Sequence, residues 1–208
     1  MFNKVDAKLL ESLRKISTGT LGHFLTEGFL DWKIQPLFRP VKLVGQAITV
    51  ACPPTDNTVL TKAIESCERG DVLVIYRYGD LRHAAWGGIL SRVAQQRGIA
   101  GVVIDGAATD WKEINDIRFP VFCRHLSALT TRRKNEGGVI GQPVTCGGLT
   151  IHSGDIILGD EDGLVAISPH RLDSVVEQGL AKEEAEERLR EDLKKSGTAV
   201  DGPPLNYS

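Results

Sequence analysis

The sequence predicts a mixed α/β sandwich domain with a central βαβ unit and a C-terminal helix. An apolar, β-branched run at 71–76 precedes a helix-like segment at 87–97 and a second apolar run at 99–104, which together indicate the βαβ unit. Short strand-like segments outnumber helices in the second half of the chain. A regular doubly wound sheet is therefore not expected.

Two helices and a strand precede this unit. Residues 6–16 place leucine and isoleucine on one face, and either Ser17 or Thr18 can cap a second short helix. Residues 41–51 predict one long strand or a strand pair interrupted at Gly45.

A proline-rich turn leads from this strand into a helix at 58–67. Asp56 and Asn57 stand directly before that helix, where we expect them to act as caps, although they could instead line a pocket. Residues 77–86 are predicted to form a polar loop inside the βαβ unit.

Four short strands are predicted after the βαβ unit, at 119–123, 148–151, 155–158 and 165–167. Pro120 places the first at a sheet edge or at a strand's start, and Gly163 suits a tight hairpin before the last. The helix at 172–195 is so charged that only a narrow apolar stripe can pack, either on its own domain or across a neighbouring subunit.

The chain of 208 residues, 41% of them hydrophobic, is predicted to form one domain at 1–196 with a tail at 197–208. A formal charge of -2 argues against nucleic acid as the main partner. No window approaches the roughly 20 apolar residues of a membrane span, and the first residues lack the apolar core of a signal peptide. We expect a cytoplasmic protein without a membrane or nucleic-acid partner.

The cysteines are scattered without a C-x-x-C pair, which predicts reduced, mostly buried thiols and no zinc site. His125 follows Cys123 by two residues, and this spacing does not by itself create a nucleophile and its base.

Two carboxylates follow the second strand of the βαβ unit. Asp105 and Asp110 stand where ligands usually bind in open α/β sheets, beside the amino end of a helix. Asp105 could contact a metal, but the Asp-Gly pair that it forms with Gly106 favours a turn.

Several ordered motifs between residues 17 and 170 resemble one known family. They are Gly45-Gln-Ala-Ile-Thr-Val, Pro54-Thr-Asp-Asn, Gly70-Asp-Val-Leu-Val, Trp86-Gly, Arg97-Gly-Ile-Ala-Gly-Val-Val-Ile-Asp-Gly, Pro120-Val-Phe, Pro143-Val-Thr-Cys-Gly-Gly and Gly154-Asp-Ile-Ile-Leu-Gly-Asp-Glu-Asp-Gly. The chain is similar to the family that joins the regulator of ribonuclease activity A with the class II 4-hydroxy-4-methyl-2-oxoglutarate aldolases.

The resemblance implies a β/β/α swivelling-type domain in a homotrimer or homohexamer, with the active site between subunits. It also implies Mg²⁺- or Mn²⁺-dependent cleavage or decarboxylation of a small 2-oxo acid through a pyruvate enolate. A divalent ion would stabilise the developing negative charge, while amides at a helix start would hold the substrate carboxylate.

Carried over by position, the resemblance assigns Asp110 as the metal anchor and the amides of Gly88, Ile89 and Leu90 as the pyruvyl carboxylate cradle. Gly87, which precedes the cradle, is also assigned to substrate binding. Mg²⁺ commonly keeps several waters, so one carboxylate can anchor it.

Three positions depart from the aldolases. The aldolases have an acidic residue, twenty intervening residues and then Arg-Asp. This chain has Gly88, twenty intervening residues and then Thr109-Asp110. Thr109, assigned to substrate binding, offers a hydroxyl in place of a guanidinium. His23 stands where relatives carry an aspartate, which suggests an altered pocket.

Three hypotheses follow for the function. The first is a metal-dependent lyase on a different oxo or hydroxy acid, with Arg82 or Arg77 replacing the missing cation and His83 as proton donor or merely structural. The second is an isomerase or hydratase on the same scaffold. The third is a non-catalytic binding protein like the ribonuclease regulator. We favour the lyase, and we expect Asp110→Ala to abolish its activity with the fold intact.

Overall fold

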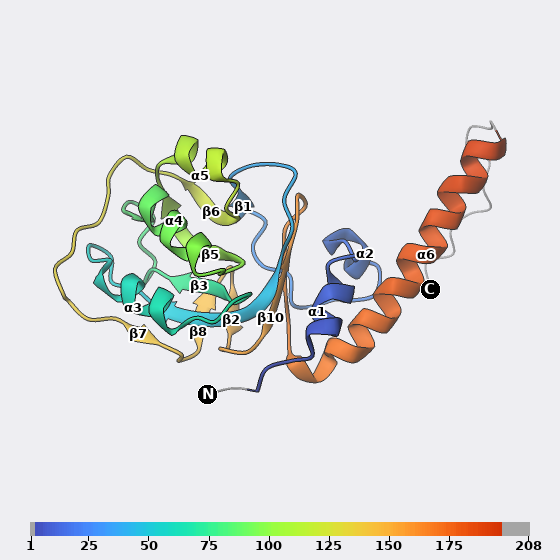
Figure 1. Cartoon of the computed structure of the whole chain (residues 1–208), viewed down its shortest axis with the longest axis horizontal. Coiled ribbons are helices and arrows are strands. Elements are labelled where there is room, and N and C mark those ends of the chain that lie inside the picture. Colours follow the sequence, from blue (N-terminus) through green and yellow to red (C-terminus); the bar gives the residue numbers. More distant parts are fainter. Residues whose placement is uncertain (1–2, 197–208) are drawn as a thin grey trace.

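The computed structural model describes residues 3–196 and contains one large mixed sheet with helices on both sides (Figure 1). Its strands are β1 (Gln35–Pro36), β2 (Leu43–Ala51), β3 (Val72–Tyr76), β4 (Ala84–Trp86), β5 (Gly101–Ala108), β6 (Val121–Leu126), β7 (Val139–Ile140), β10 (Ile156–Gly159) and β11 (Leu164–Ile167). A separate two-stranded sheet pairs β8 (Val144–Cys146) with β9 (Leu149–Ile151). The main order is β1-β6-β5-β3-β2-β10-β11, with β4 beside β5 and β7 beside β2.

Helices α3 (Thr58–Ser66), α4 (Gly88–Gln96) and α5 (Trp111–Ile117) lie on one side of the sheet. Helices α1 (Ala7–Leu13), α2 (Thr18–Gly22) and α6 (Leu172–Ser196) lie on the other, and a short 3₁₀ turn, η1 (Pro169–Arg171), precedes α6. This arrangement confirms the predicted α/β sandwich of the swivelling type with its C-terminal helix.

The centre of the sheet is parallel and carries the predicted βαβ unit. Strands β2, β3, β5 and β6 pair in parallel, whereas β10 pairs antiparallel with both β2 and β11. Gly98 ends the helix of this unit with a positive φ of 78°, as predicted. Parallel strands end at the same edge of the sheet, so the last residues of β4 and β5 lie beside the start of α4.

Two core clusters pack against the sheet. Adjacent residues of β2 divide between them, because Leu43 packs in the cluster under α3, α4 and α5, and Val44 packs in the cluster under α1 and α6. Gly45 does not interrupt this strand. A Cβ there would overlap the carbonyl oxygen of Gly70, so the glycine permits a close backbone approach.

Two predictions in this region were wrong, and one helix was not predicted. Residues 84–86 form β4 and are not part of a loop, and residues 111–117 form α5, which was not predicted. Asp105 does not make a turn, because β5 continues to Ala108 and pairs Asp105 with Tyr76. The Asp105 carboxylate instead bonds the guanidinium of Arg124 and accepts from the amide of Gly147 at 2.9 Å. It is therefore engaged in structural contacts.

Within the described part of the chain, the buried side chains of α6 lie in its first half. Leu172, Val175 and Val176 are buried, whereas the side chain of Leu189 is 54% exposed and the helix extends beyond the body (Figure 1). Whether a neighbouring subunit covers that end stays a prediction, as does the domain division, since the tail at 197–208 lies outside the described residues. Within residues 3–196, no helix has the length and apolar character of a membrane span.

Candidate functional site

A pocket of about 170 Å³ opens where β4 and β5 end and α4 begins. It brings together five residues that the sequence assigned to the site: Gly87, Ile89, Leu90, Thr109 and Asp110. The remaining lining comes from Asn57, Ala84, Ala85, Trp86, Thr130 and Thr131. Asp110 is the only charged residue in the lining among the described residues.

Trp86 fixes the first turn of α4 against the sheet. Its carbonyl accepts from the amide of Thr109 at 2.9 Å, and its buried indole donates to Ser91 Oγ at 2.8 Å. Ser91 Oγ in turn donates to the carbonyl of Gly87 at 3.0 Å. The ring of Trp86 stacks on Phe119 with centroids 6.4 Å apart. These contacts hold the helix start in a defined position above the strand ends.

The carboxylate of Asp110 lies against the amino end of α4. Its Oδ2 accepts from the amide of Gly88 at 2.9 Å, while among the described residues Oδ1 has only a long contact of 3.5 Å with the hydroxyl of Thr109. The partial positive charge of a helix start favours a carboxylate there. One of the three predicted cradle amides is thus occupied, and the amides of Ile89 and Leu90 follow it in the first turn, where helix amides lack carbonyl partners.

The two glycines at this helix start allow carboxylates to approach closely. A Cβ on Gly87 would lie 2.5 Å from Asp110 Oδ2, and a Cβ on Gly88 would overlap the carboxylate of Glu113. Glu113 lies in the first turn of α5, three residues after the N-cap residue Asp110. Glu113 was not predicted as a site residue, although its spacing from Asp110 could have indicated it.

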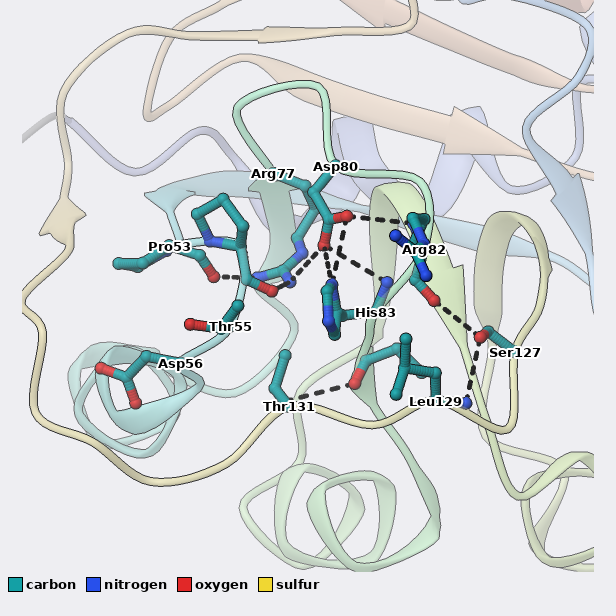
Figure 2. A network of polar contacts seen from close by, with 12 residues as sticks. Pro53, Thr55, Asp56, Arg77, Asp80, Arg82, His83, Ser127, Leu129 and Thr131 are labelled. Carbon is teal, nitrogen blue, oxygen red and sulfur yellow. Dashed lines mark hydrogen bonds and ion pairs between the residues drawn. The ribbon is translucent and has the colours of Figure 1, made fainter.

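The structure contradicts the hypothesis that Arg77 replaces the missing substrate cation. Its side chain is 0% exposed, and its guanidinium donates to the carbonyls of Pro53 at 2.7 Å and Pro54 at 2.6 Å (Figure 2). It also contacts Cys52. Arg77 therefore holds the turn at 52–54 and is not in the pocket lining.

Asp80 organises the loop that carries Arg82 and His83 (Figure 2). Its carboxylate accepts from the amide of Arg82 at 3.0 Å and lies 3.1 Å from Nδ1 of His83. Burial opposes ionisation of Asp80, but these hydrogen bonds outweigh burial and lower its pKa. Arg82 is exposed and His83 is half-buried. They directly precede Ala84, which lines the pocket, but neither of them is in the lining.

Asp56 and Asn57 have different roles. Asp56 is buried and accepts from the amides of Thr58 at 2.9 Å, Lys134 at 2.9 Å and Glu136 at 2.8 Å. Burial opposes its ionisation, yet these hydrogen bonds hold its pKa well below the usual range. Asp56 therefore accepts from the first amide of α3, whereas the N-cap residue, Asn57, makes no side-chain capping bond. Asn57 lines the pocket, and its buried Oδ1 has no hydrogen-bond partner among the described residues.

The segment 127–136 closes one side of the pocket. Ala84 donates its amide to the carbonyl of Leu129 at 2.8 Å and accepts from the amide of Thr131 at 3.1 Å. This pairing brings Thr130 and Thr131 into the lining, which the sequence did not predict.

His23 does not contribute to this pocket. Its Nε2 lies 3.4 Å from the carboxylate of Glu186 on α6, on the other side of the sheet. Within one chain His23 is not in the pocket lining, and its suggested effect on a pocket between subunits stays a prediction.

The prediction of buried thiols is confirmed for all four cysteines. Burial raises the pKa of Cys52 to about 11 and the pKa of Cys67 and Cys123 to about 12. A thiolate is the nucleophilic form, so none of these groups is suited to covalent catalysis at neutral pH.

The donor set at the pocket fits a hard divalent cation that retains water. Within residues 3–196 no group of three or more histidine, cysteine, aspartate or glutamate side chains surrounds one point. A transition-metal cage is therefore not formed by these residues. Mg²⁺ commonly binds through one or two carboxylates and several waters, and the carboxylate of Asp110 meets that requirement.

Comparisons with known proteins agree on one family. The family described as "RraA-like: Aldolase/RraA" matches residues 11–166. A protein of Halalkalibacterium halodurans named "Putative 4-hydroxy-4-methyl-2-oxoglutarate aldolase" is 36% identical over 158 residues, 76% of this chain and 74% of that protein. The 4-hydroxy-4-methyl-2-oxoglutarate aldolase of Thermus thermophilus is 35% identical over 113 residues, 54% of this chain and 68% of that protein.

Among solved structures, Streptomyces coelicolor RraAS2 superimposes with a TM-score of 0.80 at 25% identity, covering 91% of this chain and 99% of that one. Its description is an unusual member of the RNase ES inhibitor RraA protein family.

Proposed function

The chain belongs to the RraA-like family of aldolases and RraA proteins, and we propose that it is a divalent-metal-dependent lyase that releases pyruvate from a small 2-oxo acid. The observation that carries this proposal is the carboxylate of Asp110, which lies on the first amide of α4 inside a pocket with no other charged lining among the described residues. Relatives named as aldolases support the same reaction class.

The amides of Ile89 and Leu90 would bind the substrate carboxylate. Both residues line the pocket, and amides in the first turn of a helix are directed toward anions. Gly87 before them carries no side chain, and a Cβ there would lie 2.5 Å from Asp110 Oδ2. The 2-oxo acid end would therefore sit over the start of α4.

Asp110 would anchor Mg²⁺ or Mn²⁺ beside that position. When bound, such an ion supplies the positive charge that stabilises negative charge developing on the keto oxygen. Within residues 3–196, Oδ1 of Asp110 has only the long contact with Thr109, so this oxygen is the one available for the role.

The reaction breaks the bond between C3 and C4 of the substrate. The electron pair of that bond passes into the 2-oxo acid fragment, which takes up a proton at C3 and leaves as pyruvate. In an aldol cleavage the C4 hydroxyl gives up its proton and C4 becomes a carbonyl. In a decarboxylation C4 leaves as carbon dioxide.

His83 is the proposed proton donor, with Arg82 beside it. Asp80 holds Nδ1 of His83, which fixes the ring and leaves Nε2 for proton transfer. A change in the pH dependence of kcat in His83→Gln tests this role, and an unchanged profile would assign His83 to loop structure alone.

The rest of the lining favours a substrate whose far end is uncharged. The lining offers hydroxyls from Thr109, Thr130 and Thr131 and apolar surface from Ala84 and Ile89. At position 109 the similar aldolases carry an arginine. A second carboxylate would meet Asp110 without a cation from the described lining. We therefore propose a 4-hydroxy-2-oxo monoacid as the preferred substrate class.

The test is the ratio of kcat/KM for a 4-hydroxy-2-oxo monoacid to that for the matching diacid, measured with Mg²⁺. We expect the monoacid to be preferred by at least about tenfold, or about 1.4 kcal/mol. A preference for the diacid would contradict the proposed substrate class.

The second candidate function is regulatory binding without catalysis, favoured by the structural likeness to RraAS2. We also propose that the chain forms a homotrimer or homohexamer with the pocket near a subunit boundary. Mass measurement by light scattering tests this assembly, and a monomer at working concentration would contradict it.

A further inference from the structure

Gly88 lies between two carboxylates, one from Asp110 at the N-cap of α5 and one from Glu113 within α5. Its amide donates to Asp110 Oδ2 at 2.9 Å, and the space above its Cα is filled by the carboxylate of Glu113. A Cβ built on Gly88 would overlap that carboxylate, with Oε2 as the nearest atom. The carboxylate of Glu113 therefore occupies the place where a side chain at position 88 would begin.

A fixed partner holds Glu113 in this position. The guanidinium of Arg92, one turn after Gly88 on α4, donates from Nε to Oε1 of Glu113. Oε2 is thus the oxygen turned toward Gly88. The side chain of Glu113 is 32% exposed, so water can reach it, as a hydrated cation requires.

On the basis of the proposed cation site, we infer that Glu113 is its second acidic residue. It would supply from α5 the negative charge that a carboxylate at position 88 would supply from α4. Mg²⁺ sites commonly use one or two carboxylates and keep several waters, so Glu113 can act through a water. Its role is to position the hydrated ion beside Asp110, and Arg92 orients it.

The first test measures Mn²⁺ binding to the full chain by titration calorimetry, without substrate. Glu113→Gln keeps the shape of the side chain and removes its charge, so we expect Kd to rise by about tenfold, the lower end of the effect of residues around a metal. Asp116→Asn is the matched control, because Asp116 lies on the same helix, is 53% exposed and pairs with Lys112. We expect less than a twofold change there.

The second test moves the carboxylate between the two helices. Gly88→Asp alone would crowd Glu113 and add like charge, and Glu113→Ala alone would remove the acid, so each should weaken Mn²⁺ binding. The double variant Gly88→Asp with Glu113→Ala should recover binding to within about threefold of the parent, a coupling typical of residues in contact. Circular dichroism and thermal unfolding identify variants that fail to fold.

The outcomes separate this inference from the proposed function. Loss of Mn²⁺ binding in Asp110→Asn with parent-like binding in Glu113→Gln would overturn the role of Glu113 and leave the metal anchor standing. A parent chain that binds no Mn²⁺ would overturn both. Equal weakening by Glu113→Gln and Asp116→Asn would also overturn the inference, because it would show a general effect of surface charge.

Discussion

Replacing Asp110 tests the metal anchor, and the choice of substitution matters. Asp110 has φ 56° and ψ 40°, the left-handed region that asparagine tolerates better than alanine. Alanine there costs about 1–2 kcal/mol in backbone strain. Loss of the hydrogen bond to the charged carboxylate costs about 1.5–3 kcal/mol more. Asp110→Ala is therefore expected to destabilise the fold, contrary to the expectation from sequence.

Asp110→Asn separates the two effects. The carboxamide oxygen can still accept from the amide of Gly88, so we expect the free energy of unfolding to fall by only about 1 kcal/mol. Unit charges about 4 Å apart at an effective dielectric constant near 20 interact by about 4 kcal/mol. Rehydration of the ion offsets part of this term. We therefore expect Mn²⁺ to bind about 100-fold more weakly, which corresponds to about 2.7 kcal/mol.

Urea unfolding and Mn²⁺ titration of the parent, Asp110→Asn and Asp110→Ala give both quantities. Mn²⁺ binding to Asp110→Asn within twofold of the parent would refute the assignment of this carboxylate as the anchor. A stability of Asp110→Ala equal to that of Asp110→Asn would refute the backbone argument.

Three further predictions concern the surroundings of the pocket. Asp56 has a lowered pKa in the fold, so its contribution to stability is present above about pH 4 and is lost as the pH falls toward the folded pKa. The stability of Asp56→Asn should therefore depend less on pH below 5 than the stability of the parent. An equal pH dependence of the two would contradict this. Burial raises the pKa of Cys52 to about 11, so a thiol reagent at pH 8 should label the native chain far more slowly than the unfolded chain, and equal rates would contradict the burial. The double variant Gly88→Asp with Thr109→Arg should gain aldolase activity only when Glu113→Ala is added, because a side chain at position 88 would overlap the carboxylate of Glu113. A full gain without Glu113→Ala would contradict this overlap.

The sequence was sufficient to predict the βαβ unit, because its strands and helix each have a strong local pattern. It also identified five residues of the pocket lining, through a helix start and the aspartate at a strand's end. Local pattern did not reveal α5, a short segment with several charged residues, or β4, whose three residues depend on pairing with β5.

Long-range contacts account for the other errors. Arg77 resembled an exposed loop cation, but three carbonyls from the turn at 52–54 make its burial favourable. Thr130 and Thr131 reach the pocket only because their segment pairs with Ala84. Glu113 lies beside Gly88 only through the packing of α5 on α4, which the sequence does not show.

The most direct test of the lyase proposal is pyruvate release from a panel of 2-oxo acids, including oxaloacetate and 4-hydroxy-2-oxo acids. The parent and Asp110→Asn would each be assayed with Mg²⁺ or Mn²⁺ and with a chelator. We predict metal-dependent release by the parent that the chelator abolishes and that Asp110→Asn lacks. Release that persists in the chelator or in Asp110→Asn would contradict the proposed mechanism, and no release from any substrate would favour the regulatory function.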